Sequence, residues 1–216
     1  MGHSGQTPGD NVRFPGYDVL GQVGTWDEVT KGVVLRRLGP PPPNRFFSAQ
    51  EEATARALTD RLLGQDEEPK VPVLEIVDGR LTEKQFDGFR YEDMPEDDEA
   101  WRRSVAALDE EALAQYGKKF AELEPEIQND MLEGVRTARN WHGLPRIWEL
   151  WMRYCLAAFY AHPWAWNEIG FGGPAYPRGY KNIGVDALEP WEERESHPRD
   201  PVPWAQRVEQ ARRLRQ

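Results

Sequence analysis

The sequence has few residues of the types that usually build metal and redox sites. Its 216 residues include one cysteine, Cys155, and four histidines. A single cysteine excludes an intrachain disulfide, a paired-thiolate zinc site and covalent haem attachment. Cys155 stands among apolar residues at helical spacing, which indicates a buried structural thiol. His142 and Glu149 could share a helix face, but Gly143 and Pro145 interrupt that helix. We therefore predict a hydrogen-bonded structural histidine there and no metal on this chain.

Long apolar runs and an excess of positive charge are also absent. No stretch approaches the roughly 20 apolar residues that span a bilayer, so we predict no membrane span. The chain has 27 Lys and Arg against 37 Asp and Glu, a formal net charge of -10. Such a chain repels the phosphate backbone of nucleic acids. Arg36 and Arg37 precede a run of prolines rather than an apolar signal segment. We expect a cytoplasmic protein that does not bind nucleic acid.

The sequence has no recognisable motif for catalysis or for a cofactor. The GFGGP segment at 170–174 has no strand before it, and Pro174 stands where a phosphate-binding helix would begin to donate N–H groups. The acidic EDMPEDDE segment lacks the alternating ligands and the glycine of a calcium-binding loop. No nucleophile, base and oxyanion donor form a known pattern. We assign no catalytic residue, no cofactor-binding residue and no metal ligand.

The sequence does contain a series of amphipathic helical segments. Ser48 and Glu51 form the pattern of a capping box, at the start of a helix that Gly64 ends. A second helix is expected to begin near Pro72, because apolar residues follow at a spacing of 3.6 residues rather than two. Further helices are expected over 96–122 with a break near Gly117, over 125–141 and over 145–161. The last has the broadest apolar stripe and is predicted to be central.

These patterns predict an all-α fold, a bundle of about five helices with long irregular arms at both ends. An N-terminal arm at 1–45 holds apolar anchors, a short helix beginning at Trp26 or Asp27, and a stiff polyproline spacer at 39–43. A helical domain follows at 46–161. The rest of the chain, 162–216, begins in an aromatic loop and ends in a polar and basic tail.

The most unusual stretch is the aromatic segment, residues 159–180, which reads FYAHPWAWNEIGFGGPAYPRGY. It is too apolar to lie free in water, and it is too rich in proline and glycine to be one regular element. We expect a loop pinned by its side chains either to this protein's core or to another protein. His162 is expected to cap the central helix or to touch a partner. Trp and Tyr dominate the energetics of interfaces. The predicted partner-binding residues are Trp26, His162, Trp164, Trp166, Asn167, Phe171, Tyr176 and Tyr180.

Four segments in order give a resemblance: RFFSAQEEATARALTDRLL, VPVLEIVDGRL, the pattern WRxxVAALDEEA and AAFYAHPWAWNEIGFGGPAYP. Together they resemble the gluconate 2-dehydrogenase subunit 3 family over roughly residues 46–180. The resemblance implies a small helical subunit without a cofactor. It also implies a larger partner of the glucose-methanol-choline class that carries FAD, and a cytochrome subunit that often receives the electrons. Two departures stand out: the N-terminal arm replaces the family's twin-arginine signal, and HPWAWNEIGFGGP replaces its Gly-Gly-Asn-type loop.

The function expected from these features is a non-catalytic subunit that binds and stabilises or matures a larger flavin-dependent sugar or alcohol dehydrogenase. Two alternatives stay open. One is a helical scaffold with a partner that is not a redox protein. The other is a binder of small ligands, such as a sugar or a flat ring, in which the aromatic segment lines a pocket.

Overall fold

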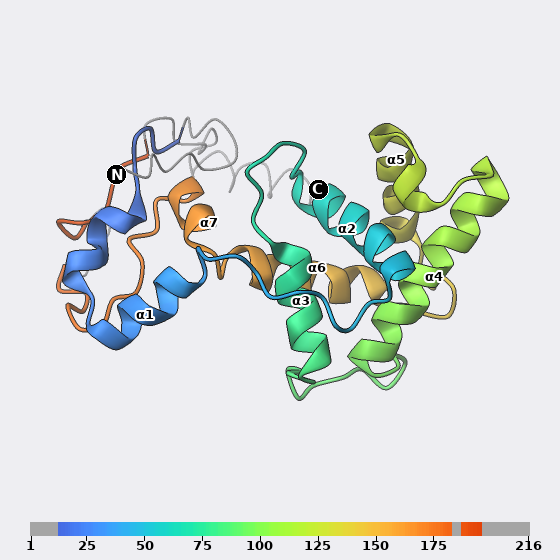
Figure 1. Cartoon of the computed structure of the whole chain (residues 1–216), viewed down its shortest axis with the longest axis horizontal. Coiled ribbons are helices and arrows are strands. Elements are labelled where there is room, and N and C mark those ends of the chain that lie inside the picture. The colour runs from blue at the N-terminus through green and yellow to red at the C-terminus, as the bar shows by residue number, and fades with distance from the viewer. Residues whose placement is uncertain (1–12, 183–186, 196–216) are drawn as a thin grey trace, which may run out of the picture.

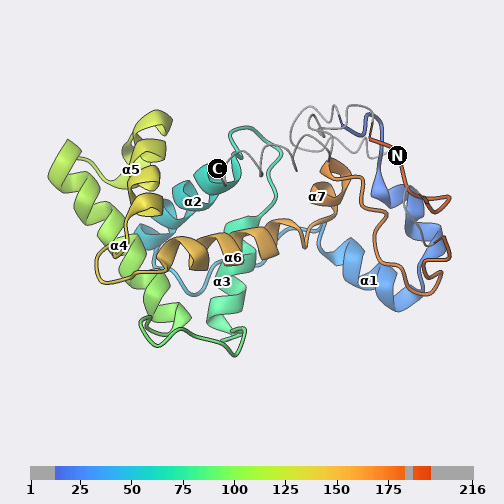
Figure 2. The same cartoon turned by 180° about the vertical axis from the view of Figure 1, so that it is seen from behind.

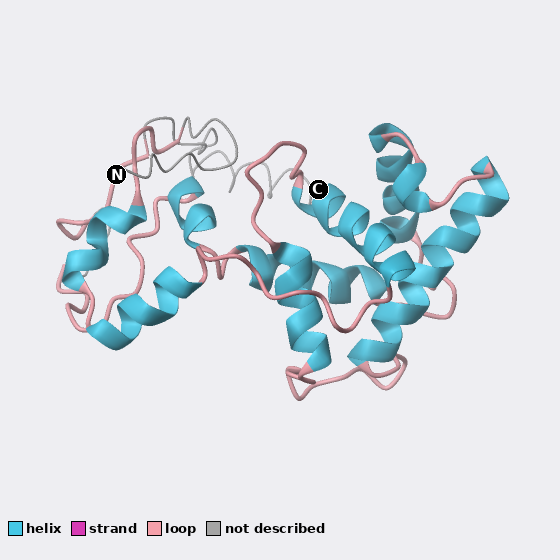
Figure 3. Ribbon diagram, in the orientation of Figure 1, coloured by secondary structure: helices cyan, strands magenta, loops and turns pink. Residues whose placement is uncertain are grey.

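The computed structural model describes residues 13–182 and 187–195. Within them the regular structure is helical and contains no strand (Figure 3), which confirms the all-α prediction. The α-helices are α1 (Glu28–Arg36), α2 (Ala49–Leu63), α3 (Val73–Thr82), α4 (Asp97–Tyr116), α5 (Pro125–Thr137), α6 (Ile147–Phe159) and α7 (Pro163–Glu168). Two 3-10 turns, η1 (Val19–Thr25) and η2 (Phe120–Glu122), complete the set.

The described chain forms two unequal bodies (Figure 1). The larger one, the helical body, consists of α2 to α6 around the main hydrophobic core. The smaller one, the end lobe, combines η1 and α1 with α7 and the described residues that follow it. Its buried apolar residues form a separate cluster. The two bodies are joined by the proline-containing segment before α2 and by the short junction between α6 and α7.

The predicted start and end of α2 and the predicted break near Gly117 are right, because local capping signals mark them. Ser48 and Glu51 form the capping box: the Glu51 carboxylate accepts from the Ser48 N–H at 2.8 Å, and the Ser48 hydroxyl accepts from the Glu51 N–H at 3.4 Å. Gly64 ends α2 in the left-handed region with φ of 62°. Gly117, with φ of 69°, ends α4, so the predicted helix over 96–122 stops there and η2 follows.

The helix predicted over 125–141 is shorter than expected. It ends at Thr137, and Ala138 is already extended. The reason is tertiary packing: the chain turns so that Trp141 is buried against Trp151, with ring centroids 5.7 Å apart. The indole N–H of Trp141 then donates to Glu111 on α4 at 2.9 Å. Burial of a tryptophan stabilises the fold by more than one further helical turn would.

Helix α6 is the central helix, as predicted, and packs on α2, α3 and α4; Figure 2 shows it from behind. Its largest inward side chains are Trp151 and Tyr154, both fully buried. Each has a partner on α4 for its polar atom, because the Trp151 N–H donates to Ser104 at 3.0 Å and the Tyr154 hydroxyl to Asp97 at 2.7 Å. Cys155 is also buried, and burial raises the pKa of its thiol to about 12.

A buried carboxylate fixes the chain where it enters the helical body. Asp78 of α3 accepts three backbone N–H groups in a row, from Arg45 at 2.7 Å, Phe46 at 2.9 Å and Phe47 at 3.0 Å. Phe47 is thereby held in the core against Trp101. Since backbone donors that are buried must be paired, Asp78 allows the proline segment to join α2 without a strand or a helix.

Candidate partner-binding surface

The aromatic segment is not a continuous loop, because it contains the short helix α7. Pro163 occupies the first helical position, where its missing N–H costs nothing. His162 is the N-cap of α7 rather than a cap of α6, and its Nδ1 accepts from the Trp164 N–H at 3.3 Å. The imidazole is 2% exposed. Burial lowers the pKa of His162 to about 4, so it is neutral at pH 7.

The surface that pins the aromatic segment is this protein's own N-terminal arm. The side-chain oxygen of Asn167 accepts from the backbone N–H of Val19 at 2.8 Å, across 148 residues of sequence. Beside this bond, the side chains of Val19, Trp26, Val34 and Trp166 form the buried cluster of the end lobe. The arm and α7 therefore complete one another, because neither has another apolar layer to cover these side chains.

Glycines after α7 allow the arm to approach closely. Gly173 has φ of +75°, and a Cβ built on it would lie 2.5 Å from Cζ2 of Trp26. The same Cβ would lie 3.1 Å from a methyl group of Val19. Gly170, also with positive φ, is covered by the ring of Phe14. Only glycine satisfies both the backbone conformation and the contact at these two positions.

Polar contacts at the edge of the lobe fix the arm further. The Tyr17 hydroxyl donates to the Phe171 carbonyl at 3.1 Å, and burial raises the pKa of Tyr17 to about 12. Arg178 donates to the Thr25 hydroxyl at 2.9 Å. Arg37, just after α1, donates to the Ala161 carbonyl at 2.7 Å. These contacts join the arm to the chain before and after α7.

The structure separates the predicted partner-binding residues into two groups. Trp26, His162, Trp166 and Asn167 are buried inside the chain, and Trp164 is partly buried against the helical body. The exposed members are Phe171, Tyr176 and Tyr180, with 37%, 67% and 48% of their surface accessible. Direct contact with a partner thus stays a prediction for these three side chains, while the buried ones determine the shape of the lobe that presents them.

Two exposed apolar residues of this region were not among the predicted ones. Tyr160 ends α6, and Ile169 ends α7; both are exposed. Tyr160 lies next to the buried Trp166, whose indole N–H donates to its carbonyl at 2.7 Å. The sequence does hold a signal for Tyr160, because it lies four residues after Leu156, outside the apolar stripe of α6, and Leu156 is exposed as well. Ile169 follows the buried Trp166 at helical spacing, so no local signal distinguishes it from a core residue.

His142, predicted to be a hydrogen-bonded structural histidine, is exposed, and the carboxylate it approaches lies beyond hydrogen-bond distance. His142 Nε2 lies 3.6 Å from Glu111 on α4, and Glu149 is not its partner. His142 has φ of +49°, in the turn that follows the buried Trp141. Among residues 13–182 and 187–195, no three His, Cys, Asp or Glu side chains come together as metal ligands would.

The geometry defines a class of small helical protein in which the arm before the helical body and the segment after it build an aromatic lobe. A family model described as Gluconate 2-dehydrogenase subunit 3 matches residues 49–173, more than half of the chain. The chain belongs to this family. The match runs from the start of α2 to Gly173 and so leaves the N-terminal arm outside it. Neither a search of curated proteins nor a search of solved structures gave a match. In the part of the chain that is described, no helix is long and apolar enough to cross a membrane.

Proposed function

We propose that this chain is a small subunit of a dehydrogenase complex and that it stabilises or matures a larger subunit of the glucose-methanol-choline class. In this proposal FAD is bound by the larger subunit, this chain contributes no catalytic residue, and a cytochrome subunit receives the electrons. The observation that carries the proposal is the family match over residues 49–173, because the family is named as a subunit of gluconate 2-dehydrogenase.

The end lobe supplies a surface suited to such a partner. Phe171, Tyr176 and Tyr180 follow one another after α7 and expose large parts of their rings. Aromatic side chains are enriched at the centres of protein interfaces, since each contributes much apolar area and has few rotamers to fix. The rings lie on a segment that the arm holds in place, so binding would order little additional chain.

The proposal is tested by purifying the tagged chain from its native host and recording the visible absorbance spectrum of the eluate. We expect a larger chain with a flavin spectrum to co-elute. A Tyr176→Ala, Tyr180→Ala double variant should weaken this complex by more than about 2 kcal/mol, which is the scale of a hot spot. The control is Tyr116→Ala, which removes an exposed ring from the far end of α4.

Two results would contradict the proposal. One is a colourless chain that elutes alone under conditions in which it is folded. The other is a flavoprotein complex that the Tyr176→Ala, Tyr180→Ala double variant and the Tyr116→Ala control weaken equally, because the aromatic rings of the end lobe would then have no special role.

A further inference from the structure

A groove of about 290 Å³ lies where the end lobe meets the helical body. One side of it is formed by the proline segment, including Pro41, and by Trp164 of α7. The other side is formed by α2, by α3 and by the residues between these helices. Neither body forms the groove alone. Small-molecule sites occur preferentially at such junctions, and this volume suits a ligand of about one ring.

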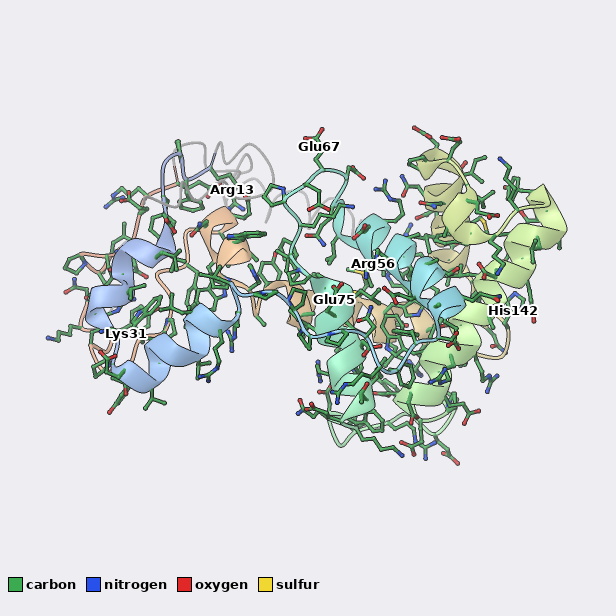
Figure 4. All side chains as sticks on the ribbon, in the orientation of Figure 1. Arg13, Lys31, Arg56, Glu67, Glu75 and His142 are labelled. Carbon is green, nitrogen blue, oxygen red and sulfur yellow. The ribbon has the colours of Figure 1, made fainter. Side chains whose placement is uncertain are left out.

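Two ion pairs and the carboxylate of Glu68 line the groove. Arg56 of α2 donates to Glu75 of α3 at 2.9 Å, and Lys70 donates to Asp60 at 2.7 Å. Figure 4 shows Arg56 and Glu75 on their neighbouring helices. All four side chains are partly exposed. The groove therefore offers charged donors and charged acceptors side by side, rather than a field of one sign.

The carboxylate of Glu75 has one oxygen without a hydrogen bond from the described part of the chain. Glu75 Oε1 accepts from Arg56, but Oε2 is shielded from solvent and receives no hydrogen bond from any described residue. A carboxylate oxygen that is buried without a donor is costly. The terminal torsion of glutamate is broad, so a rotation of the carboxylate can turn this oxygen toward a donor in the groove.

The chemistry of the lining restricts the class of ligand. A simple anion would be repelled by Asp60, Glu68 and Glu75. A simple cation would be repelled by Arg56 and Lys70. A wholly apolar ligand would remove water from the five charged side chains of the lining without replacing its hydrogen bonds. Hydroxyl groups avoid both problems, because each one donates to a carboxylate and accepts from a guanidinium or an ammonium.

The groove also has an apolar wall, which suits the C–H groups of a polyhydroxylated ligand. Trp164 lines the groove and is held in place by an edge-on contact with His162, with ring centroids 4.8 Å apart. Pro41 adds a second apolar ring. We propose that this groove binds a neutral, polyhydroxylated ligand of the size of one pyranose sugar, with its C–H face on Trp164 and its hydroxyls on the two ion pairs. The proposal does not depend on the proposed function, because it concerns the isolated chain.

The test is calorimetric titration of the full-length chain with D-glucose as the probe. We expect saturable binding that Glu75→Gln weakens about tenfold or more, the effect of losing a hydrogen bond to a charged group. Glu67→Gln is the matched control, because Glu67 is an exposed carboxylate outside the groove lining. Asp60→Asn serves as a second variant should Glu75→Gln disturb folding, and circular dichroism verifies the fold of each protein.

Trp164→Phe gives an independent readout, since it reduces the apolar wall and leaves both ion pairs intact. We expect it to weaken binding of glucose as well. Three outcomes would overturn the proposal: no saturable binding of glucose by the folded chain, binding that none of the groove variants changes, or binding of inorganic phosphate or gluconate with no binding of glucose. The last outcome would identify the groove as an anion site.

Discussion

Replacing Gly173 with alanine should open the end lobe. The alanine Cβ would lie 2.5 Å from Cζ2 of Trp26, and the backbone there has φ of +75°. The left-handed conformation costs an L-residue about 1–2 kcal/mol. Forcing a methyl group into a packed contact costs about 1–3 kcal/mol more. The total of about 2–5 kcal/mol is large for a lobe whose buried apolar cluster has only four members among the described residues.

Gly179→Ala is the matched control for this experiment. Gly179 has φ of +69°, but nothing lies within 4 Å of the position of its Cβ. The control therefore has the conformational cost without the clash. Hydrogen exchange measured by mass spectrometry should show faster exchange in peptides from η1 and α1 for Gly173→Ala, by about tenfold or more relative to Gly179→Ala. Equal exchange in the two variants would refute the argument that Trp26 and Gly173 hold the lobe closed.

Two further predictions concern buried polar groups. Asp78→Asn should lower the free energy of unfolding by about 1.5–3 kcal/mol, because the charged acceptor of three backbone N–H groups is lost. Thermal unfolding measures this loss, and the control is Asp66→Asn, which removes an exposed carboxylate from its ion pair with Arg61. His162 has its folded-state pKa lowered from 6.5 to about 4 by burial, so its contribution to stability is complete above pH 6.5 and is lost as the pH falls through 4. Urea unfolding at several pH values should therefore show a weaker acid dependence for His162→Gln, and an unchanged profile would contradict this.

The helical body could be predicted well because its signals are local. The capping box at Ser48, the glycines at 64 and 117 and the broad apolar stripe of α6 each act within one or two helical turns. The errors arise where tertiary packing overrides the local pattern. Residues 138–141 leave the helix because Trp141 has a place in the core. The helix at 163–168 is a different kind of error, because the local signals of His162 as N-cap and Pro163 at the first helical position were present in the sequence and were missed.

The candidate surface could be predicted only in part. Its aromatic residues are conspicuous in the sequence, and two possible supports for them were recognised, the protein's own core or a partner. Which of the two supports is used depends on contacts such as the one between Asn167 and Val19, which are 148 residues apart. No pattern in a single sequence predicts a contact of this kind. The groove at Glu75 and Trp164 was likewise out of reach, because its residues come from four separate segments.

The pairing of the N-terminal arm with α7 has a consequence during synthesis. The ribosome makes Val19 long before Asn167, and about 150 residues at 5–20 residues per second correspond to roughly 7–30 s. Throughout this interval Trp26 and Val34 have no α7 to cover them, whereas α2 to α6 can already assemble. The nascent arm is thus an exposed apolar segment on a growing chain, and its protection in that period falls to chaperones or to the charged residues beside it.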